Sequence, residues 1–413
     1  MQHAITVFVF LDDLDNHTEQ IQELNALVKA SESEVVETLI QHRESPDPRT
    51  YIGKGKVEEL RMMIEAHQPD FIVFDDELSG STMRNLYDLL GIKIVDRTML
   101  IMDIFARRTH SLMSQYQVEL AQLQYRKSHL RGMGNILSQQ GAGIGTRGPG
   151  ETKLETDRRN IDNRIAELRR KIKEQQKTVE LQRKTRSDNE QKIVALVGYT
   201  NSGKSTMMNH LLGHYESDGG EVFVKDMLFA TLDTFVRRIE IDNARHFLLV
   251  DTVGFVNKLP HQLIEAFKST LEEIREADLV LHILDSSDDN LTLQHEATLH
   301  VLEEIDALDI PRLTILNKWD KPEKFDLVEA DLRVSSKTGY GMDNLEKRVI
   351  SELFGATHER EFLLGYEDFS VKNNILERSQ LLDESYTDEG NLIKVLIDDK
   401  WLEKYRIYLH ERT

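Results

Sequence analysis

A run of apolar residues that ends directly in a glycine-rich octapeptide constrains the fold more than any other part of this chain. Residues 193–197 read IVALV, which is typical of a buried parallel strand, and residues 206–212 predict a helix. Between them stands G-x-x-x-x-G-K-S, the phosphate-binding loop in the context that it requires. We therefore predict a phosphate site made by Gly198, Tyr199, Thr200, Asn201, Ser202, Gly203, Lys204 and Ser205.

The chemistry of this octapeptide fits a nucleoside triphosphate bound with Mg²⁺. Its glycines allow backbone N–H groups and a helix N-terminus to surround phosphate oxygens. Lys204 would reach the β- and γ-phosphates, and the hydroxyl of Ser205 would hold the metal. A glycine-rich turn without a ligand is the alternative, and the agreement of motif and context argues against it.

Two later motifs predict the parts that respond to a γ-phosphate. Thr231, in FATLD, follows a polar segment suited to a mobile switch and would complete the Mg²⁺ coordination. In DTVG, Asp251 can hold the water shell of the metal and the Gly254 N–H can sense the phosphate. We expect Lys204, Thr231 and Gly254 to be catalytic. The predicted contacts here are Phe229, Ala230, Thr231, Leu232, Asp233, Asp251, Thr252, Val253 and Gly254.

A second pair of motifs, NKWD and SSK, predicts which base is bound, since each follows a predicted strand. The carboxylate of Asp320 can accept both hydrogen bonds from the N1–H and N2–H₂ edge of guanine, which adenine cannot offer. A backbone N–H of SSK can donate to the guanine carbonyl. In this order and spacing the motifs predict an α/β GTPase domain over residues 191–355. The contacts expected from this pair are Asn317, Lys318, Trp319, Asp320, Ser335, Ser336 and Lys337.

Charge is distributed unevenly along the 413 residues, whose net charge is −20. Residues 101–190 carry 18 Lys and Arg against 11 Asp and Glu, whereas the rest of the chain is acidic. A localised basic face can bind a polyanion even in an acidic protein. The chain has no cysteine and no apolar run of membrane-spanning length, so we expect a cytoplasmic protein without a transmembrane segment.

Both ends of the chain predict small α/β domains. In residues 1–104 strands alternate with helices, which favours a largely parallel sheet. The loop at 51–56, YIGKGK, could bind an anion, although a plain helix-entry turn also explains it. In residues 356–413 we expect a helix near 369–382, then a turn that leads into a strand.

Residues 105–190 predict an antiparallel helical hairpin with a basic second helix. The apolar seams are Met113, Tyr116, Leu120 and Leu123 on one helix and Ile161, Ile165, Leu168, Ile172 and Val179 on the other. The glycine-rich connection, 132–150, is longer than a helix–helix turn needs. This favours a loop that approaches another surface closely over a flexible linker.

These motifs resemble those of the Obg–HflX group of translational GTPases, and within it the HflX family. Besides the G-domain motifs, the likeness rests on YIGKGKVEEL (51–60), FDDELSGS (74–81), VDRT (95–98) and GAGIGTRGPGETKLETDRR (141–159). It covers roughly residues 1–355. Trp319 stands where a smaller residue is common, but its neighbours Asn317 and Asp320 are intact.

The resemblance implies a monomeric, Mg²⁺-dependent GTPase that binds GTP and GDP, binds the large ribosomal subunit and splits ribosomes into subunits. Ser205 and Thr231 would hold the metal. The hairpin loop would reach ribosomal RNA near the peptidyl transferase centre. Phe255 replaces the glutamine that orients water in Ras-like proteins, so slow intrinsic hydrolysis is expected. The residues expected to contact RNA are Arg131, Arg147, Lys153, Arg158 and Arg159.

Other functions remain open on the residues alone. A metabolic P-loop kinase would have no use for Asn317, Asp320 and Ser336. A purely structural ribosome-binding protein would leave Lys204 and Thr231 without a role. An ATP-dependent RNA-remodelling factor with a second nucleotide site in the N-terminal domain shares the RNA partner and differs in the nucleotide.

Overall fold

The computed structural model describes residues 1–11, 17–109, 111–133, 149–188, 191–214, 235–242, 245–252, 254–256, 263, 271, 273–288, 291–321 and 328–410. Within these ranges, the side chains of residues 19, 131–133, 149–154, 178–188 and 400 are left out of the description. The chain forms two compact units, one made chiefly of residues 1–182 and the other chiefly of residues 183–413. None of the described helices is both long and apolar enough to cross a membrane.

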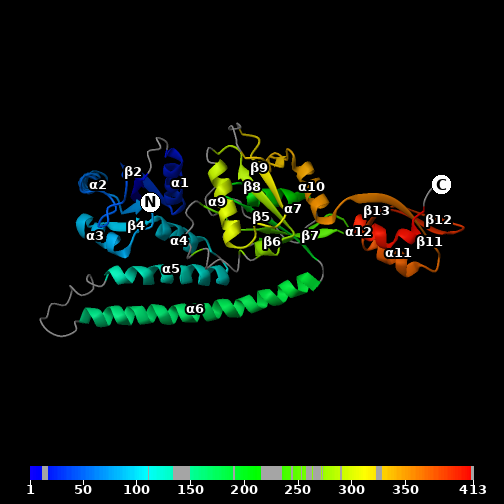
Figure 1. The fold of residues 1–413 in the computed structure, drawn as a ribbon, viewed down its shortest axis with the longest axis horizontal. Helices are drawn as coiled ribbons and strands as arrows, with labels where there is room; N and C mark the ends of the chain where they lie inside the picture. The colour runs from blue at the N-terminus through cyan, green and yellow to red at the C-terminus, as the bar shows by residue number, and fades with distance from the viewer. Residues whose placement is uncertain are drawn as a thin grey trace. The chain divides into compact units, whose positions relative to one another are not determined.

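The N-terminal domain is a parallel sheet flanked by helices (Figure 1). Its strands run in the order β2-β1-β3-β4, and every neighbouring pair is parallel, as the alternating sequence pattern predicts. The inner strand β1 is apolar and buried over most of its length. The elements are β1 (Gln2–Phe10), α1 (Thr18–Ala30), β2 (Ser33–His42), α2 (Lys54–His67), β3 (Phe71–Phe74), α3 (Gly80–Leu90), β4 (Lys93–Asp96) and α4 (Arg97–Arg108).

Two long helices, α5 (Leu112–Met133) and α6 (Pro149–Asp188), lie side by side (Figure 1). The predicted seam is confirmed wherever side chains are described, and the side chain of Val179 lies outside that description. Arg164 also joins the helices, because its Nε and Nη2 donate to the two carboxylate oxygens of Glu119 at 2.7 and 2.9 Å. The seam residues are Leu120, Ile165, Leu168 and Ile172, with Met113, Tyr116, Leu123 and Ile161 packed against them.

The helix α5 is fastened to the N-terminal domain by buried polar contacts. The Tyr125 hydroxyl donates to Asp96 Oδ2 at 2.5 Å, and His129 Nε2 lies 2.7 Å from the carbonyl oxygen of Leu78. Burial raises the pKa of Asp96, although hydrogen bonds from Tyr125 and backbone N–H groups oppose the shift. The first hairpin helix therefore shares a polar core with the sheet domain.

The GTPase-like domain has a six-stranded sheet in the order β10-β9-β8-β5-β7-β6, in which only β6 is antiparallel to its neighbour. Apolar residues of the inner strands pack against Met207 and Leu211 of α7 and Leu345 of α10. The elements are β5 (Lys192–Gly198), α7 (Lys204–His214), β6 (Phe235–Glu240), β7 (His246–Asp251), β8 (Leu279–Asp285), α9 (Leu291–Glu304), β9 (Arg312–Asn317), β10 (Leu332–Arg333) and α10 (Met342–Phe354).

The C-terminal residues form an antiparallel sheet, β11-β13-β12, and here one expectation was wrong. The helix expected over 369–382 ends at Leu376, and residues 379–387 form a strand instead. Ser379 donates its hydroxyl to the Ile375 carbonyl, and the following residues pair with β13. The elements are β11 (Thr357–Leu364), α11 (Phe369–Leu376), β12 (Ser379–Thr387), β13 (Gly390–Asp398), α12 (Asp399–Lys404) and the 3₁₀ helix η1 (Arg406–Tyr408).

Candidate nucleotide site

The predicted motifs meet because four strands are parallel neighbours. Gly198 ends β5, Asp251 ends β7, Asp285 ends β8 and Asn317 ends β9, so these residues lie along one edge of the sheet. Ligands of open α/β sheets bind at the carboxyl ends of the strands. Motifs that are far apart in the sequence therefore form one site.

Asn317 ties the phosphate loop to the base-binding loop. Its Nδ2 donates to the Ser202 carbonyl at 2.9 Å, and its Oδ1 accepts from the Ser336 N–H at 3.0 Å. Gly203 lies against this side chain with a φ of 97°, and a Cβ there would stand 2.2 Å from Asn317 Nδ2. Glycine is therefore required at this position by both backbone conformation and space.

Lys204 is buried at the start of α7 and bonds to the loop itself. Its Nζ donates to the carbonyl oxygens of Gly198 at 3.0 Å and Tyr199 at 2.8 Å. Burial lowers the pKa of Lys204 to about 8, and the nearby Asp251 carboxylate opposes this shift. The ammonium is thus held where a phosphate would lie against it.

The residues predicted at the metal fit a hard cation. The Ser205 hydroxyl donates to Asp251 Oδ2 at 2.7 Å, which places a hydroxyl and a carboxylate at one point beside the phosphate loop. Mg²⁺ prefers oxygen ligands of these kinds. The buried hydroxyls of Thr200 and Ser202 have no hydrogen-bond partner among the described residues, as expected of groups beside a polar ligand.

The segment after β7 packs closely on the phosphate loop. The Thr200 N–H donates to the Phe255 carbonyl at 2.8 Å, and the Phe255 N–H donates to the Gly198 carbonyl at 3.1 Å. A Cβ added to Gly254 would lie 2.8 Å from Thr200 Cα and 3.0 Å from Lys204 Nζ. The backbone of Gly254 therefore lies beside the ammonium that would meet a γ-phosphate.

The base-binding motif is held by its own ion pair. Lys318 Nζ lies 2.7 Å from Asp285 Oδ2 and donates to the Asn201 carbonyl at 2.7 Å. Asp320 lies exposed, and the Ser335 hydroxyl donates to its Oδ1 at 2.6 Å. This hydrogen bond lowers the pKa of Asp320, so the carboxylate is charged and available as an acceptor.

Asp285 is a site residue that the sequence reasoning missed. The signal was available, because Asp285 ends a buried apolar strand as Asp251 does. Nothing in the sequence, however, states that it pairs with Lys318.

The remaining predicted contacts divide into described and undescribed residues. Tyr199 is buried, Thr252 donates its hydroxyl to the Leu196 carbonyl at 2.7 Å, Trp319 stacks near Arg333, and Lys337 is exposed. The predictions that lie outside the described residues concern Phe229, Ala230, Thr231, Leu232, Asp233, Val253 and Arg147, and the side chains of Arg131 and Lys153.

The basic residues of α6 whose side chains are described fall into two groups. Arg164, Arg170 and Lys171 pair with glutamates, at 2.8 Å for the Glu167 contacts of Arg164 and Lys171 and 3.4 Å for Arg170 with Glu174. A second group is exposed and has no ion-pair partner among the described residues. At about 100° per residue its members lie on one flank of the helix, next to the seam. This basic stripe consists of Arg158, Arg159, Arg169, Lys173 and Lys177.

A mostly parallel sheet whose strand ends bring together a phosphate-loop motif, a paired hydroxyl and carboxylate, and the NKWD and SSK motifs is typical of a P-loop GTPase. Three family models match the chain in succession. They are GTP-binding GTPase N-terminal (residues 18–106), GTP-binding GTPase Middle Region (108–186) and 50S ribosome-binding GTPase (193–318).

The similarity to known proteins extends over nearly the whole chain. It is 42% identical to GTPase HflX of Caldanaerobacter subterraneus subsp. tengcongensis over 99% of this chain and 94% of that protein. It is 36% identical to GTPase HflX of Escherichia coli K12 over 95% of this chain and 92% of that protein. The chain therefore belongs to the HflX family of GTPases, and it is a GTP-hydrolysing enzyme.

A solved structure is similar to this chain at lower identity. It is a GTP-binding protein from Sulfolobus solfataricus in complex with GDP, 23% identical over 86% of this chain and 99% of that one, with a TM-score of 0.43.

Proposed function

We propose that this GTPase binds the large ribosomal subunit and promotes dissociation of ribosomes into subunits, with the bound nucleotide controlling the cycle. The proposal rests mainly on the basic stripe of α6. This stripe offers positive charge to RNA and belongs to the same chain as a GTPase domain. The matching family model, 50S ribosome-binding GTPase, supports the same partner. The protein with GTP bound would favour the ribosome-bound arrangement.

The site geometry supports the proposed nucleotide contacts. Residues 198–205 would surround the phosphates, with Lys204 on the β- and γ-phosphates. Residues 317–320 and 335–337 would hold guanine, and Asp320 would accept its two edge donors. Asn317 holds the two loops together through its hydrogen bonds with the Ser202 carbonyl and the Ser336 N–H.

Ser205 and Thr231 are the proposed Mg²⁺ ligands, with Asp251 on the water shell. The metal would supply charge neutralisation at the phosphates when bound. The chain itself holds the Ser205 hydroxyl and the Asp251 carboxylate together beside the loop. Removal of divalent cations with a chelator should therefore abolish hydrolysis.

A γ-phosphate would order the switch segments through Thr231 and the Gly254 N–H. At position 255 the chain offers a buried phenylalanine, which cannot orient water by hydrogen bonding. A partner would then complete the catalytic site. GTP hydrolysis at the full rate would then require contact with the ribosome. The protein would act as a cytoplasmic monomer.

Residues 1–104, 105–190, 191–355 and 356–413 are proposed as four functional parts. The hairpin would supply contact with RNA phosphates, because the basic stripe of α6 lies there. The glycine-rich loop 132–150 would intrude into the RNA, since glycine permits close backbone approach.

Sedimentation of 70S ribosomes through a sucrose gradient tests the proposal. With the protein and a non-hydrolysable GTP analogue, free subunits should increase and the protein should sediment with the large subunit. With GDP both effects should weaken. Ribosomes that stay intact while the protein is loaded with the analogue would refute subunit splitting.

The ATP-dependent RNA-remodelling alternative is not favoured, because the family and the G-domain motifs both indicate GTP. It would require a second nucleotide to bind residues 1–190. Equilibrium binding of ATP to the full chain already saturated with GDP would measure such a site directly.

A further inference from the structure

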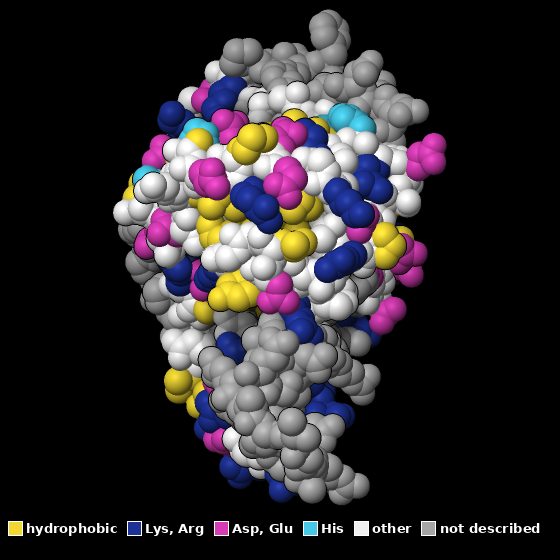
Figure 2. Space-filling model, turned by 90° about the vertical axis from the view of Figure 1, so that its left-hand side faces the viewer, with side chains coloured by type: hydrophobic (Ala, Val, Ile, Leu, Met, Phe, Trp, Pro, Cys, Tyr) yellow, Lys and Arg dark blue, Asp and Glu magenta, His cyan; other side chains and the backbone are white. Residues whose placement is uncertain are grey.

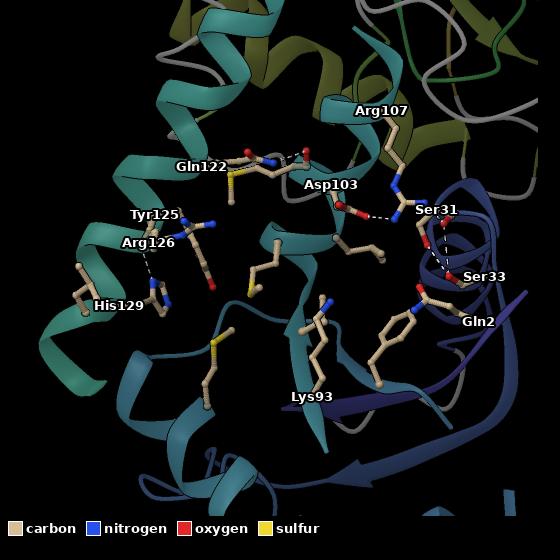
Figure 3. A pocket seen from close by; sticks show the side chains of 17 residues that line it. Gln2, Ser31, Ser33, Lys93, Asp103, Arg107, Gln122, Tyr125, Arg126 and His129 are labelled. Carbon is tan, nitrogen blue, oxygen red and sulfur yellow. Dashed lines mark hydrogen bonds and ion pairs between the residues drawn. The ribbon is translucent and has the colours of Figure 1, made fainter. Parts of the chain in front are cut away.

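A cavity of about 490 Å³ lies between the N-terminal sheet and the first hairpin helix (Figure 3). Its size is within the range of small-molecule sites, which run from roughly 300 to 1,000 Å³. The walls come chiefly from β4, α4 and α5, with Phe71 from β3 and Met83 from α3, and none of them belongs to the nucleotide site. The apolar lining includes Phe71, Met83, Val95, Met99, Leu100, Met102 and Leu130.

Most polar groups around the cavity are already engaged. Asp103 and Arg107 form an ion pair at 2.8 Å, and Arg107 also donates to the Ser31 carbonyl at 3.0 Å. The Tyr125 hydroxyl and the His129 ring bond to the protein, so these residues offer the cavity mainly apolar ring surface. No unpaired carboxylate is therefore present among the described lining residues to attract a cation.

Two lining cations, Lys93 and Arg126, have no hydrogen-bond or ion-pair partner among the described residues. Figure 3 shows the stem of Lys93 rising from β4 into the cavity, with Arg126 on the facing helix α5. Both side chains are exposed, whereas the floor residues Met83, Leu100 and Met102 are buried. The cavity thus combines an apolar floor with an unpaired positive rim.

We propose that this cavity binds a free amphipathic anion, a small molecule with an apolar body and one carboxylate or phosphate group. The apolar body would lie on the three methionines, whose flexible and polarizable side chains adapt to varied shapes. The anionic head would lie between Lys93 and Arg126. Because the walls belong to both α4 and α5, the ligand would brace the joint between the sheet domain and the hairpin.

Calorimetric titration of the full chain with three ten-carbon amphiphiles tests this site. Decanoate, an anion, should bind saturably at one site, whereas decanol, its neutral counterpart, should bind at least about tenfold more weakly. Decyltrimethylammonium, a cation, should not bind at this site. Equal affinity for decanoate and decanol would overturn the assignment.

Variants locate the binding. Lys93→Gln combined with Arg126→Gln should remove the preference for decanoate over decanol, and Met99→Trp should weaken both by filling the cavity. The matched control, Arg49→Gln with Lys29→Gln, removes two exposed charges elsewhere in the same domain and should leave decanoate binding unchanged. An unchanged circular dichroism spectrum and melting temperature show that each variant is folded.

Two results would refute the proposal. One is undiminished decanoate binding by the Lys93 and Arg126 double variant. The other is co-sedimentation with phosphatidylglycerol vesicles that decanoate competes and that the Lys93 and Arg126 double variant loses, since this would identify a membrane surface and not a free ligand.

Discussion

Asp320 is the residue that we propose selects the base, because its charged carboxylate offers two acceptors to the two donors of guanine. Asp320→Asn should weaken GTP binding by roughly 100-fold, since hydrogen bonds to charged groups contribute about 1.5–3 kcal/mol each. The variant should favour xanthosine triphosphate, whose edge matches an amide. Equilibrium titration with fluorescent analogues of both nucleotides measures the change.

The exposed Asp343, in the first turn of α10, provides the control for this substitution. Asp343→Asn makes the same chemical change outside the site and should leave both affinities as they are. Unchanged GTP affinity in Asp320→Asn would refute the assignment.

Lys204 predicts how nucleotide binding depends on pH. Its pKa is lowered to about 8 by burial, so the neutral amine accumulates in the free protein above that pH. Bound phosphates favour the ammonium and raise this pKa, so GDP binding at about pH 9 should take up a proton and affinity should fall between about pH 7 and 9.

Calorimetry in two buffers with different ionisation enthalpies measures the proton uptake directly. At about pH 7 Lys204 is charged in both states, so the apparent binding enthalpy should change little between the buffers on its account. The absence of uptake at about pH 9 would show that the amine is charged in the free protein.

At the scale of helices, the two groups of basic residues on α6 allow a matched comparison. Arg169→Gln with Lys173→Gln should lower affinity for the large subunit and reduce the slope of log affinity against log salt by about 2, as two lost phosphate contacts require. Arg170→Gln with Lys171→Gln removes the same charge from side chains that pair with glutamates. Filter binding over a range of salt concentrations measures both slopes.

The smaller change is expected for the Arg170 and Lys171 pair, because Glu174 and Glu167 already offset these charges. Equal losses in both double variants would mean that RNA affinity follows total charge and not the stripe.

Shortening the glycine-rich loop tests whether the loop acts in ribosome binding or in subunit splitting. Replacement of residues 134–149 by a four-residue turn should leave basal GTP hydrolysis intact and weaken ribosome binding only moderately, since the loop has little charge. Subunit splitting should be lost in the sucrose-gradient assay. Splitting at the normal rate would show that the loop is a plain linker.

The sequence predicted elements best where one local pattern decides the structure. The parallel strands of the N-terminal domain and the hairpin seam around Leu168 have clear periods, and the structure confirms both. Ile375 and Leu382 stand seven residues apart, as on one face of a helix, but pairing with β13 turns residues 379–387 into a strand. Long-range pairing of this kind overrides local propensity.

The site was predictable in its residue types and less so in its contacts. Glycine, lysine and aspartate at fixed spacing indicate their chemistry, whereas the Lys318–Asp285 pair depends on which strands become neighbours. The cavity beside Lys93 left no sequence signal, because its walls come from separate elements.

At the scale of the whole molecule, charge is distributed differently between the N-terminal domain and the hairpin. Figure 2 shows acidic and basic side chains interspersed over the N-terminal domain, so that this face has no single-sign field. Only residues 101–190 carry an excess of basic residues in the sequence. RNA affinity is therefore expected to depend on the hairpin.

The rate of GTP hydrolysis with and without ribosomes tests whether ribosome contact by the hairpin is coupled to the GTPase domain. Because Phe255 cannot position water, the isolated protein should hydrolyse GTP slowly, and purified ribosomes should accelerate it at least roughly tenfold. Release of phosphate under single-turnover conditions measures both rates. Fast hydrolysis that ribosomes do not alter would contradict the need for a partner.

Trp319 gives this protein a built-in optical reporter. The chain has two tryptophans, and Trp319 lies within the guanine motif, with the Arg333 guanidinium 5.2 Å from its ring. Trp401 lies in the C-terminal domain between Arg378 and Lys404 and contributes a background that Trp401→Phe removes. If the base binds at this motif as proposed, intrinsic emission should follow its arrival and departure in real time, with an unlabelled nucleotide and an otherwise native chain.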